Sequence, residues 1–199
     1  MNNEKFSFIS QKKYTYKINK SEFIVYVFPI NNLNEIETFI QKISFDNKKA
    51  NCIVWGYSLW TDNDFVYKYF ESIEPKKTSG FKIDYFLKIK NLYNCLIIIA
   101  RYKSGSNLGI GLLSRSYFNS CLLAWDESNI KKIEFLYLYK LDFKLDNQKT
   151  IFNTISNLNF KILEIKYDQT NTLFFYGNKK IESFSNELHN SKFIKNFWA

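Results

Sequence analysis

The feature that most constrains the fold is an uninterrupted apolar run at residues 95–100, followed by a glycine-rich segment and then by apolar residues at helical spacing. Gly105, Gly109 and Gly111 are three of only six glycines in the chain. A strand, a tight turn and a helix in this order aim backbone N–H groups toward an anion. Glycine also permits a tight turn with positive φ. The segment 101–117, called the glycine window below, is therefore either a plain turn or an anion-binding loop.

Both arginines of the chain, Arg101 and Arg115, lie in the glycine window, although the chain holds 28 basic residues. A guanidinium group is planar, permanently charged and suited to two-pronged phosphate contacts, which a lysine does not make. Arg101 ends the predicted strand, and Arg115 follows Gly111 by one helical turn with its side chain leaning back toward the turn. We therefore expect the two guanidinium groups to converge on one anion site.

The composition is that of a folded protein rather than a disordered one. The chain has 199 residues, of which 46% are hydrophobic and 19% aromatic, enough for a sizeable core. Its apolar runs are too short to span a membrane, and its first residues lack the pattern of a secretory signal. Cys52, Cys95 and Cys121 are widely spaced in apolar surroundings, as reduced, buried thiols are. We expect a cytoplasmic protein with no metal, cofactor or membrane segment.

Basic charge is concentrated around the glycine window. The formal net charge of the whole chain is +9, and residues 75–117 carry eight basic residues against the single acid Asp84, a net charge of +7. A lysine-rich composition alone would spread this charge more evenly, although a merely solvated lysine surface is the alternative. Clustered basic charge attracts phosphates. The expected phosphate contacts are Arg101, Arg115, Lys76, Lys77 and Lys103, with Tyr102 stacking on bases.

Residue patterns predict an α+β chain of two domains, 1–128 and 129–199. The first has strands at 21–28, 52–59, 64–70 and 95–101. It also has three helices: one capped by Asn32 or Asn34, one over 81–92 and one over 111–124. The second restarts with a strand at 133–145, a helix at 148–158, strands at 160–167 and 172–176, a helix at 181–189 and an apolar tail at 193–198. Strand, helix, strand, strand, helix, strand is the ferredoxin-like split βαβ arrangement.

The glycine window resembles the signature of the YigZ/IMPACT family, which reads Arg-Tyr-Phe-Gly-Gly-Ile-Lys-Leu-Gly-Thr-Gly-Gly-Leu-Val-Arg-Ala-Tyr. The shared positions are Arg101, Tyr102, Gly105, Leu108, Gly109, Gly111, Leu113, Arg115 and Tyr117. Residues 21–24 resemble the family's Ser-x-Phe-Ile, and residues 74–80 resemble its Glu-Pro-Ser-Gly-Thr-Ala-Gly. Asn51 and Cys52 stand where the family has His-Asn-Cys, with Ala50 in place of the histidine. Further departures are Ser72, Ile73, Lys77, Ser104, Asn107 and Leu112.

The resemblance implies an N-terminal βαβ domain like that of a small-subunit ribosomal protein and the fourth domain of elongation factor G. It implies a ferredoxin-like C-terminal domain similar to one in that factor. It also implies binding to RNA or the ribosome, or to a protein of the translation machinery, since eukaryotic relatives act in translational control. The expected site comprises Arg101, Arg115, Lys103, Gly105, Gly109, Gly111, Lys76, Lys77, Thr78 and Tyr102.

Two other functions fit the sequence. One is an enzyme acting on an anionic metabolite, in a cleft between residues 78–80 and the glycine window, with Thr78, Glu74 and the arginines as ligands. Enzymatic activity is the less favoured interpretation, because the only histidine, His189, is expected at the surface and no residue pattern indicates an acid–base pair or a metal site. The other is a protein-interaction module built on the aromatic-rich C-terminal domain.

Overall fold

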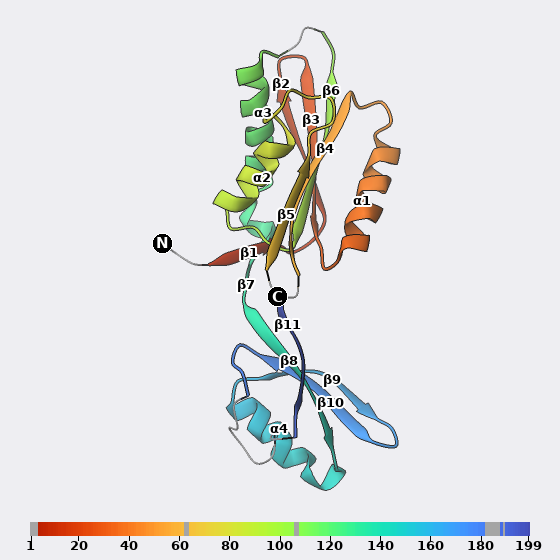
Figure 1. Ribbon diagram of the computed structural model, residues 1–199, viewed down its shortest axis with the longest axis vertical. Coiled ribbons are helices and arrows are strands. Elements are labelled where there is room, and N and C mark those ends of the chain that lie inside the picture. Colours follow the sequence, from red (N-terminus) through yellow and green to blue (C-terminus); the bar gives the residue numbers. More distant parts are fainter. Residues whose placement is uncertain (1–3, 62–63, 106–107, 182–187, 189) are drawn as a thin grey trace. The chain divides into compact units, whose positions relative to one another are not determined.

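The computed structural model describes residues 4–61, 64–105, 108–181, 188 and 190–199. The protein has a two-domain α+β fold, and the described residues form eleven strands and four α-helices (Figure 1). The chain divides into two compact units, Met1–Ile133 and Glu134–Ala199. None of the described helices is long and apolar enough to cross a membrane.

The N-terminal unit is built on a five-stranded sheet in which every neighbouring pair is antiparallel. Its strands, in spatial order, are β2 (Lys12–Ile18), β3 (Ser21–Pro29), β6 (Cys95–Lys103), β4 (Cys52–Trp60) and β5 (Phe65–Phe70). Helix α1 (Leu33–Asp46) connects β3 to β4, and both strands flank β6. Because both are antiparallel to β6, β3 and β4 run parallel to each other. The expected βαβ unit is therefore present in its split form.

Helices cover both faces of this sheet, with α1 on one side and α2 (Gly80–Ile89) and α3 (Ile110–Leu123) on the other (Figure 1). Strand β6 lies in the middle and is buried on both faces. Ile97 and Ile99 pack in the core under α2 and α3, whereas Leu96 and Ile98 belong to the core under α1. A strand covered on both faces needs apolar residues at every position, which explains the unbroken run after Cys95.

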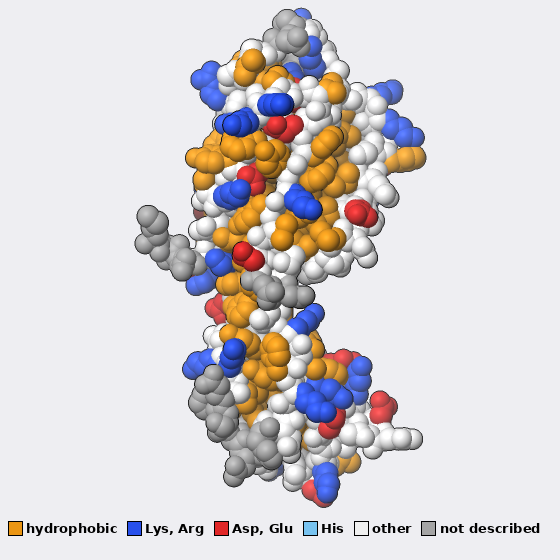
Figure 2. Space-filling model, in the orientation of Figure 1, with side chains coloured by type: hydrophobic (Ala, Val, Ile, Leu, Met, Phe, Trp, Pro, Cys, Tyr) orange, Lys and Arg blue, Asp and Glu red, His pale blue; other side chains and the backbone are white. Residues whose placement is uncertain are grey.

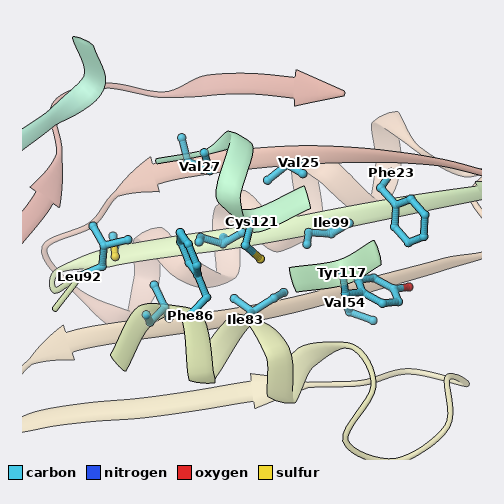
Figure 3. Packing of buried hydrophobic residues seen from close by; sticks show 14 of the residues in the cluster. Phe23, Val25, Val27, Val54, Ile83, Phe86, Leu92, Ile99, Tyr117 and Cys121 are labelled. Carbon is cyan, nitrogen blue, oxygen red and sulfur yellow. The ribbon is translucent and has the colours of Figure 1, made fainter. Parts of the chain in front are cut away.

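Aromatic and branched side chains fill the space between the sheet and helices α2 and α3. Phe86 of α2 and Tyr117 of α3 are fully buried and point toward the strands (Figure 3). Phe23 of β3 meets Tyr117 edge to face, with ring centroids 5.0 Å apart. Each such buried side chain contributes about 1.5–3 kcal/mol of hydrophobic stabilisation. This packing holds α3 against the sheet, with Tyr117 beside Phe23, which the register places opposite Arg101 near the end of β6.

The contacts divide the chain after Ile133, whereas the sequence patterns predict a domain boundary after Ser128. Strand β1 (Lys5–Phe8) pairs with β7 (Ile130–Ile133) in antiparallel register, from Lys5 opposite Ile133 to Phe8 opposite Ile130. Residues 130–133 therefore belong to the N-terminal unit, and Glu134 begins the second unit. The partner that holds β7 is thus a four-residue strand near the start of the chain, far from β7 in sequence.

The C-terminal unit is a four-stranded antiparallel sheet with the order β11-β8-β10-β9. Its elements are β8 (Phe135–Phe143), α4 (Gln148–Asn157), β9 (Lys161–Tyr167), β10 (Asn171–Gly177) and β11 (Lys192–Trp198). This order is that of a ferredoxin-like sheet, with β10 between the parallel strands β8 and β9. Helix α4 packs Ile151 and Ile155 against Leu173 and Phe175. Residues 182–187 and 189 of the expected last helix lie outside the described residues.

Candidate nucleic-acid interface

Arg101, expected as an exposed phosphate contact, is buried. Its Nη1 donates a hydrogen bond to Glu74 Oε1 at 2.7 Å, and the two side chains are 7% and 8% exposed. The guanidinium carbon also lies 5.6 Å from the centre of the Phe23 ring. A guanidinium group held in this way is not available to a nucleic acid. Arg115, by contrast, is exposed on α3. The expectation that the two arginines share one open anion site is therefore wrong, because Arg101 is buried against Glu74.

Glu74 is the centre of this buried cluster. The same oxygen that meets Arg101 accepts hydrogen bonds from the Tyr117 hydroxyl at 2.8 Å and from Cys52 Sγ at 3.0 Å. Burial acts to raise the pKa of Glu74, but hydrogen bonds from Cys52, Arg101 and Tyr117, with the charge of Arg101, outweigh it and lower that pKa. Burial raises the pKa of Cys52 to about 12, so its thiol stays protonated near neutral pH. The cluster therefore joins β4, β6, α3 and the β5–α2 loop as a structural ion pair.

The loop before α2 is also held by internal contacts. Thr78, expected to bind an anion, is buried, and its hydroxyl donates to the Pro75 carbonyl at 2.6 Å. The Glu71 carboxylate accepts hydrogen bonds from the backbone N–H groups of Lys77 at 2.9 Å and Ser79 at 3.3 Å. An anion approaching the start of α2 would meet a carboxylate already in place. Thr78 thus has a structural contact in the loop, whereas the expected phosphate contacts Lys76 and Lys77 are exposed.

The backbone conformation requires glycine at only one of the three glycines of the window. Gly105 has φ of +105°, a conformation that other residues rarely adopt. Gly109 and Gly111 lack a positive φ, and a Cβ atom added at either would meet nothing within 4 Å in the described structure. Gly109 precedes the first residue of α3 without a side-chain cap. Packing among the described residues therefore requires glycine at neither Gly109 nor Gly111.

A basic pocket of about 500 Å³ lies at the end of the sheet where the central strand β6 terminates. We call it the lysine pocket; its lining residues are Lys17, Asn19, Lys20, Ser21, Glu22, Lys49, Asn51, Tyr102, Lys103 and Ser104. The lining contains four lysines and one acid, a formal net charge of +3. Lys and Arg side chains gather at the corresponding end of the N-terminal unit, near the β2–β3 turn and the end of β6 (Figures 1 and 2). The pocket therefore offers a concentrated site for phosphate.

Backbone hydrogen bonds fix the walls of the lysine pocket. The end of β6 pairs with the start of β3, so Lys103 lies opposite Ser21. The Ser104 N–H then donates to the Lys20 carbonyl at 2.8 Å, which ties the β2–β3 turn to the end of β6. On the other side, the Lys103 N–H donates to Asn51 Oδ1 at 2.6 Å. The lysines thus extend from a preformed frame, which lowers the entropic cost of binding a ligand.

Two residues of the predicted site lie in this pocket, and three lysines were missed. Tyr102 and Lys103 line it from the end of β6, which extends two residues beyond the predicted end of the strand at Arg101. Lys17, Lys20 and Lys49 come from the β2–β3 hairpin and the α1–β4 loop, which are distant in sequence from the glycine window. The available signal was a pair of lysines around the turn at residues 19–20. Recognising it requires the first hairpin to be predicted.

The fold and these sites define a two-domain α+β protein with a buried hydrogen-bonded cluster around Glu74 and a basic surface pocket. The chain belongs to the IMPACT family, because the family model described as the Impact N-terminal domain matches residues 19–124. That match covers all of the lysine pocket except Lys17, as well as the whole buried cluster.

Two curated relatives agree with this assignment, and a solved structure shares the fold. The chain is 26% identical to IMPACT family member YvyE of Bacillus subtilis, over 88% of this chain and 82% of that protein. It is 29% identical to an IMPACT family member of Haemophilus influenzae, over 86% of this chain and 84% of that protein. The fold resembles the crystal structure of a hypothetical protein with a TM-score of 0.61 and 17% identity, over 88% of this chain and 86% of that chain.

Proposed function

We propose that this protein binds RNA through the lysine pocket and acts in translation or its regulation. The observation that carries the proposal is the gathering of Lys17, Lys20, Lys49 and Lys103 around one cavity with a single acid. Lysines that neutralise phosphates release condensed counterions, and this release is a large part of nucleic-acid affinity. The likeness to the YigZ/IMPACT family supports the link to translation. The proposal implies a cytoplasmic location and the ribosome or a translation protein as partner.

In this proposal the pocket binds and positions RNA. Lys20 and Lys49 line the pocket from two different segments, the β2–β3 turn and the α1–β4 loop, and in this proposal both contact the RNA backbone phosphates. The Tyr102 ring also lines the pocket, and its hydroxyl donates to Asn47 Oδ1 at 3.0 Å. A ring fixed by this bond can stack on a base at low entropic cost.

Charge reversal inside and outside the pocket tests the proposal. We expect Lys20→Glu with Lys49→Glu to weaken binding of a fluorescently labelled RNA by about tenfold or more at moderate salt. A matched control is Lys42→Glu with Lys68→Glu, which makes the same charge change at exposed positions of the N-terminal unit outside the pocket. Equal losses in both double variants would show that net charge, rather than the pocket, is responsible. An unchanged affinity in the pocket variant would reject the proposal.

A small anionic metabolite is the second candidate ligand, and the size of the pocket favours it specifically. A volume of about 500 Å³ lies within the range of small-molecule sites, roughly 300–1,000 Å³. A thermal-shift screen of nucleotides and phosphorylated metabolites distinguishes the two candidates. A ligand at about 100 times its dissociation constant stabilises the folded state by about 2.7 kcal/mol. A metabolite that raises the melting temperature and competes with RNA would favour this second candidate.

A further inference from the structure

Among the described residues of the C-terminal unit, no helix covers one face of the four-stranded sheet, which we call the open face. The other face carries the core, where α4 packs against Leu141, Leu173 and Phe175. Because side chains alternate along a strand, the residues between these core positions point to the opposite side. On β10 these are Thr172, Phe174 and Tyr176.

Aromatic side chains occupy the middle of this open face. The register places Phe174 opposite Lys140 and Tyr176 opposite Leu138 of the neighbouring strand β8. Phe197 of β11 lies opposite Leu136 of β8 and meets Tyr176, with ring centroids 6.1 Å apart. Phe174, Tyr176 and Phe197 are all half-buried, so part of each ring is open to solvent. Adjacent strands thus present aromatic surface at the spacing of a sheet.

Lysines surround these rings. The strand register brings Lys140, Lys161, Lys166, Lys192 and Lys195 to the same face. Lys166 Nζ lies 5.6 Å from the centre of the Phe174 ring, which confirms that the two side chains share this side. The acids that the register places among them are Asp142 and Glu164, so these residues give the face a formal net charge of +3. The Thr172 hydroxyl donates to Asp142 Oδ1 at 2.8 Å, and Lys140 Nζ lies 3.3 Å from the same oxygen.

We propose that this open face is a second nucleic-acid site, which binds single-stranded RNA. Four-stranded sheets that present aromatic rings on an open face stack unpaired bases, while nearby cations contact the phosphates. Phe174 and Tyr176 supply the stacking surface, and Lys166 and Lys195 lie on the flanking strands β9 and β11. A duplex keeps its bases stacked on each other and offers none to these rings. The face therefore selects single strands, a preference that the lysine pocket alone does not give.

The test uses the full-length protein, a short single-stranded RNA and a duplex RNA of the same length. We expect Phe174→Leu with Tyr176→Leu to weaken single-strand binding by about 25-fold or more, because each of the two lost stacks costs at least about fivefold. Duplex binding is expected to stay unchanged. Lys166→Glu with Lys195→Glu is expected to weaken single-strand binding and to reduce its salt dependence.

Two controls lie on the other side of the same unit. Tyr167→Leu removes a 55% exposed ring that contacts Phe143 of the core, and Lys149→Glu reverses an exposed charge on α4. Both are expected to bind single-stranded RNA like the wild type. Equal loss on single strands and duplex, no loss in the Phe174 and Tyr176 variant, or equal loss in the controls would overturn the inference. Capture of a protein through this face after nuclease treatment, without RNA affinity, would also overturn it.

This inference stands independently of the lysine pocket. If Lys20→Glu with Lys49→Glu leaves all RNA binding intact while the Phe174 and Tyr176 variant loses single-strand binding, the proposed function of the pocket fails and the sheet site remains. The reverse pattern removes the sheet site and leaves the pocket.

Discussion

Arg101 and Glu74 form a buried ion pair at 2.7 Å that joins the end of β6 to the loop before α2. Tyr117 and Cys52 donate to the same Glu74 oxygen. These residues come from three separate blocks that resemble the family pattern, so motif positions distant in sequence meet in one cluster. The buried pair with Glu74 thus explains why residue 101 is an arginine.

Loss of the Glu74 charge is expected to destabilise the protein strongly. Glu74→Gln keeps the shape of the side chain but leaves the buried Arg101 guanidinium without a counterion. Removing one partner of a buried pair costs about 3–5 kcal/mol of unfolding free energy. Urea unfolding measures this difference. The control Glu22→Gln breaks the exposed Lys17–Glu22 pair at 3.4 Å, which is worth at most about 1 kcal/mol. Equal effects of the two variants would contradict the structural role of the cluster.

The contribution of Glu74 is expected to depend on pH. Its pKa is lower in the folded protein than its ordinary value, so the folded state favours the ionised carboxylate. The stabilisation is fully present above the pKa in the unfolded chain, about 4.3, and is lost as the pH falls through the folded-state pKa. The difference in unfolding free energy between the wild type and Glu74→Gln is therefore largest near neutral pH and shrinks in acid. A difference that grows below about pH 4 would contradict this assignment.

Two glycines are expected to respond to alanine in opposite ways. A Cβ atom at Gly80 would clash with the Phe70 carbonyl oxygen, so Gly80→Ala forces the backbone apart. We expect it to cost about 1–3 kcal/mol. Gly111 has open space around it in α3, so Gly111→Ala is expected to stabilise the protein by up to about 1 kcal/mol. Thermal unfolding of both variants is the measurement, and a destabilised Gly111→Ala would show an unrecognised packing role.

Lys77 carries backbone strain that glycine would relieve. It has φ of +63°, and it stands where the family pattern has glycine. A left-handed conformation costs a residue with a Cβ atom about 1–2 kcal/mol, part of which the greater chain entropy of glycine offsets. We expect Lys77→Gly to raise the unfolding free energy by about 0.5–1 kcal/mol. Lys76→Gly, at a neighbouring exposed position not among the residues of positive φ, is the control and is expected to lower it.

Most of the fold was predictable because long apolar runs report burial directly. The run after Cys95 is continuous since β6 is covered on both faces, and the strand and helix pattern after residue 133 predicted the ferredoxin-like unit. The first hairpin was harder to recognise. Strand β2 lies at the sheet edge with lysines among its aromatic residues, so its apolar signal is weak.

The site was predictable only in part, because sequence position does not reveal which charges are neutralised inside the fold. Arg101 follows an apolar run, which predicts an exposed side chain at the end of the strand. In the fold it is paired with Glu74, which lies in a loop 27 residues earlier in the sequence. Lys103, two positions further along β6, does line the pocket. Its companions Lys20 and Lys49 approach it only through strand pairing, which depends on the whole sheet.

Phosphate binding in the lysine pocket can be tested through the salt dependence of RNA binding. The affinity of the full-length protein for one RNA is measured over a series of salt concentrations, for the wild type and for Lys20→Glu with Lys49→Glu. Each lost phosphate contact reduces the slope of log affinity against log salt by about 0.7–0.9. We expect the slope of the pocket variant to fall by about 1.4–1.8, while Lys42→Glu with Lys68→Glu keeps the wild-type slope. A flat salt dependence of the wild type, or identical slopes in the wild type and the pocket variant, would contradict phosphate binding in the lysine pocket.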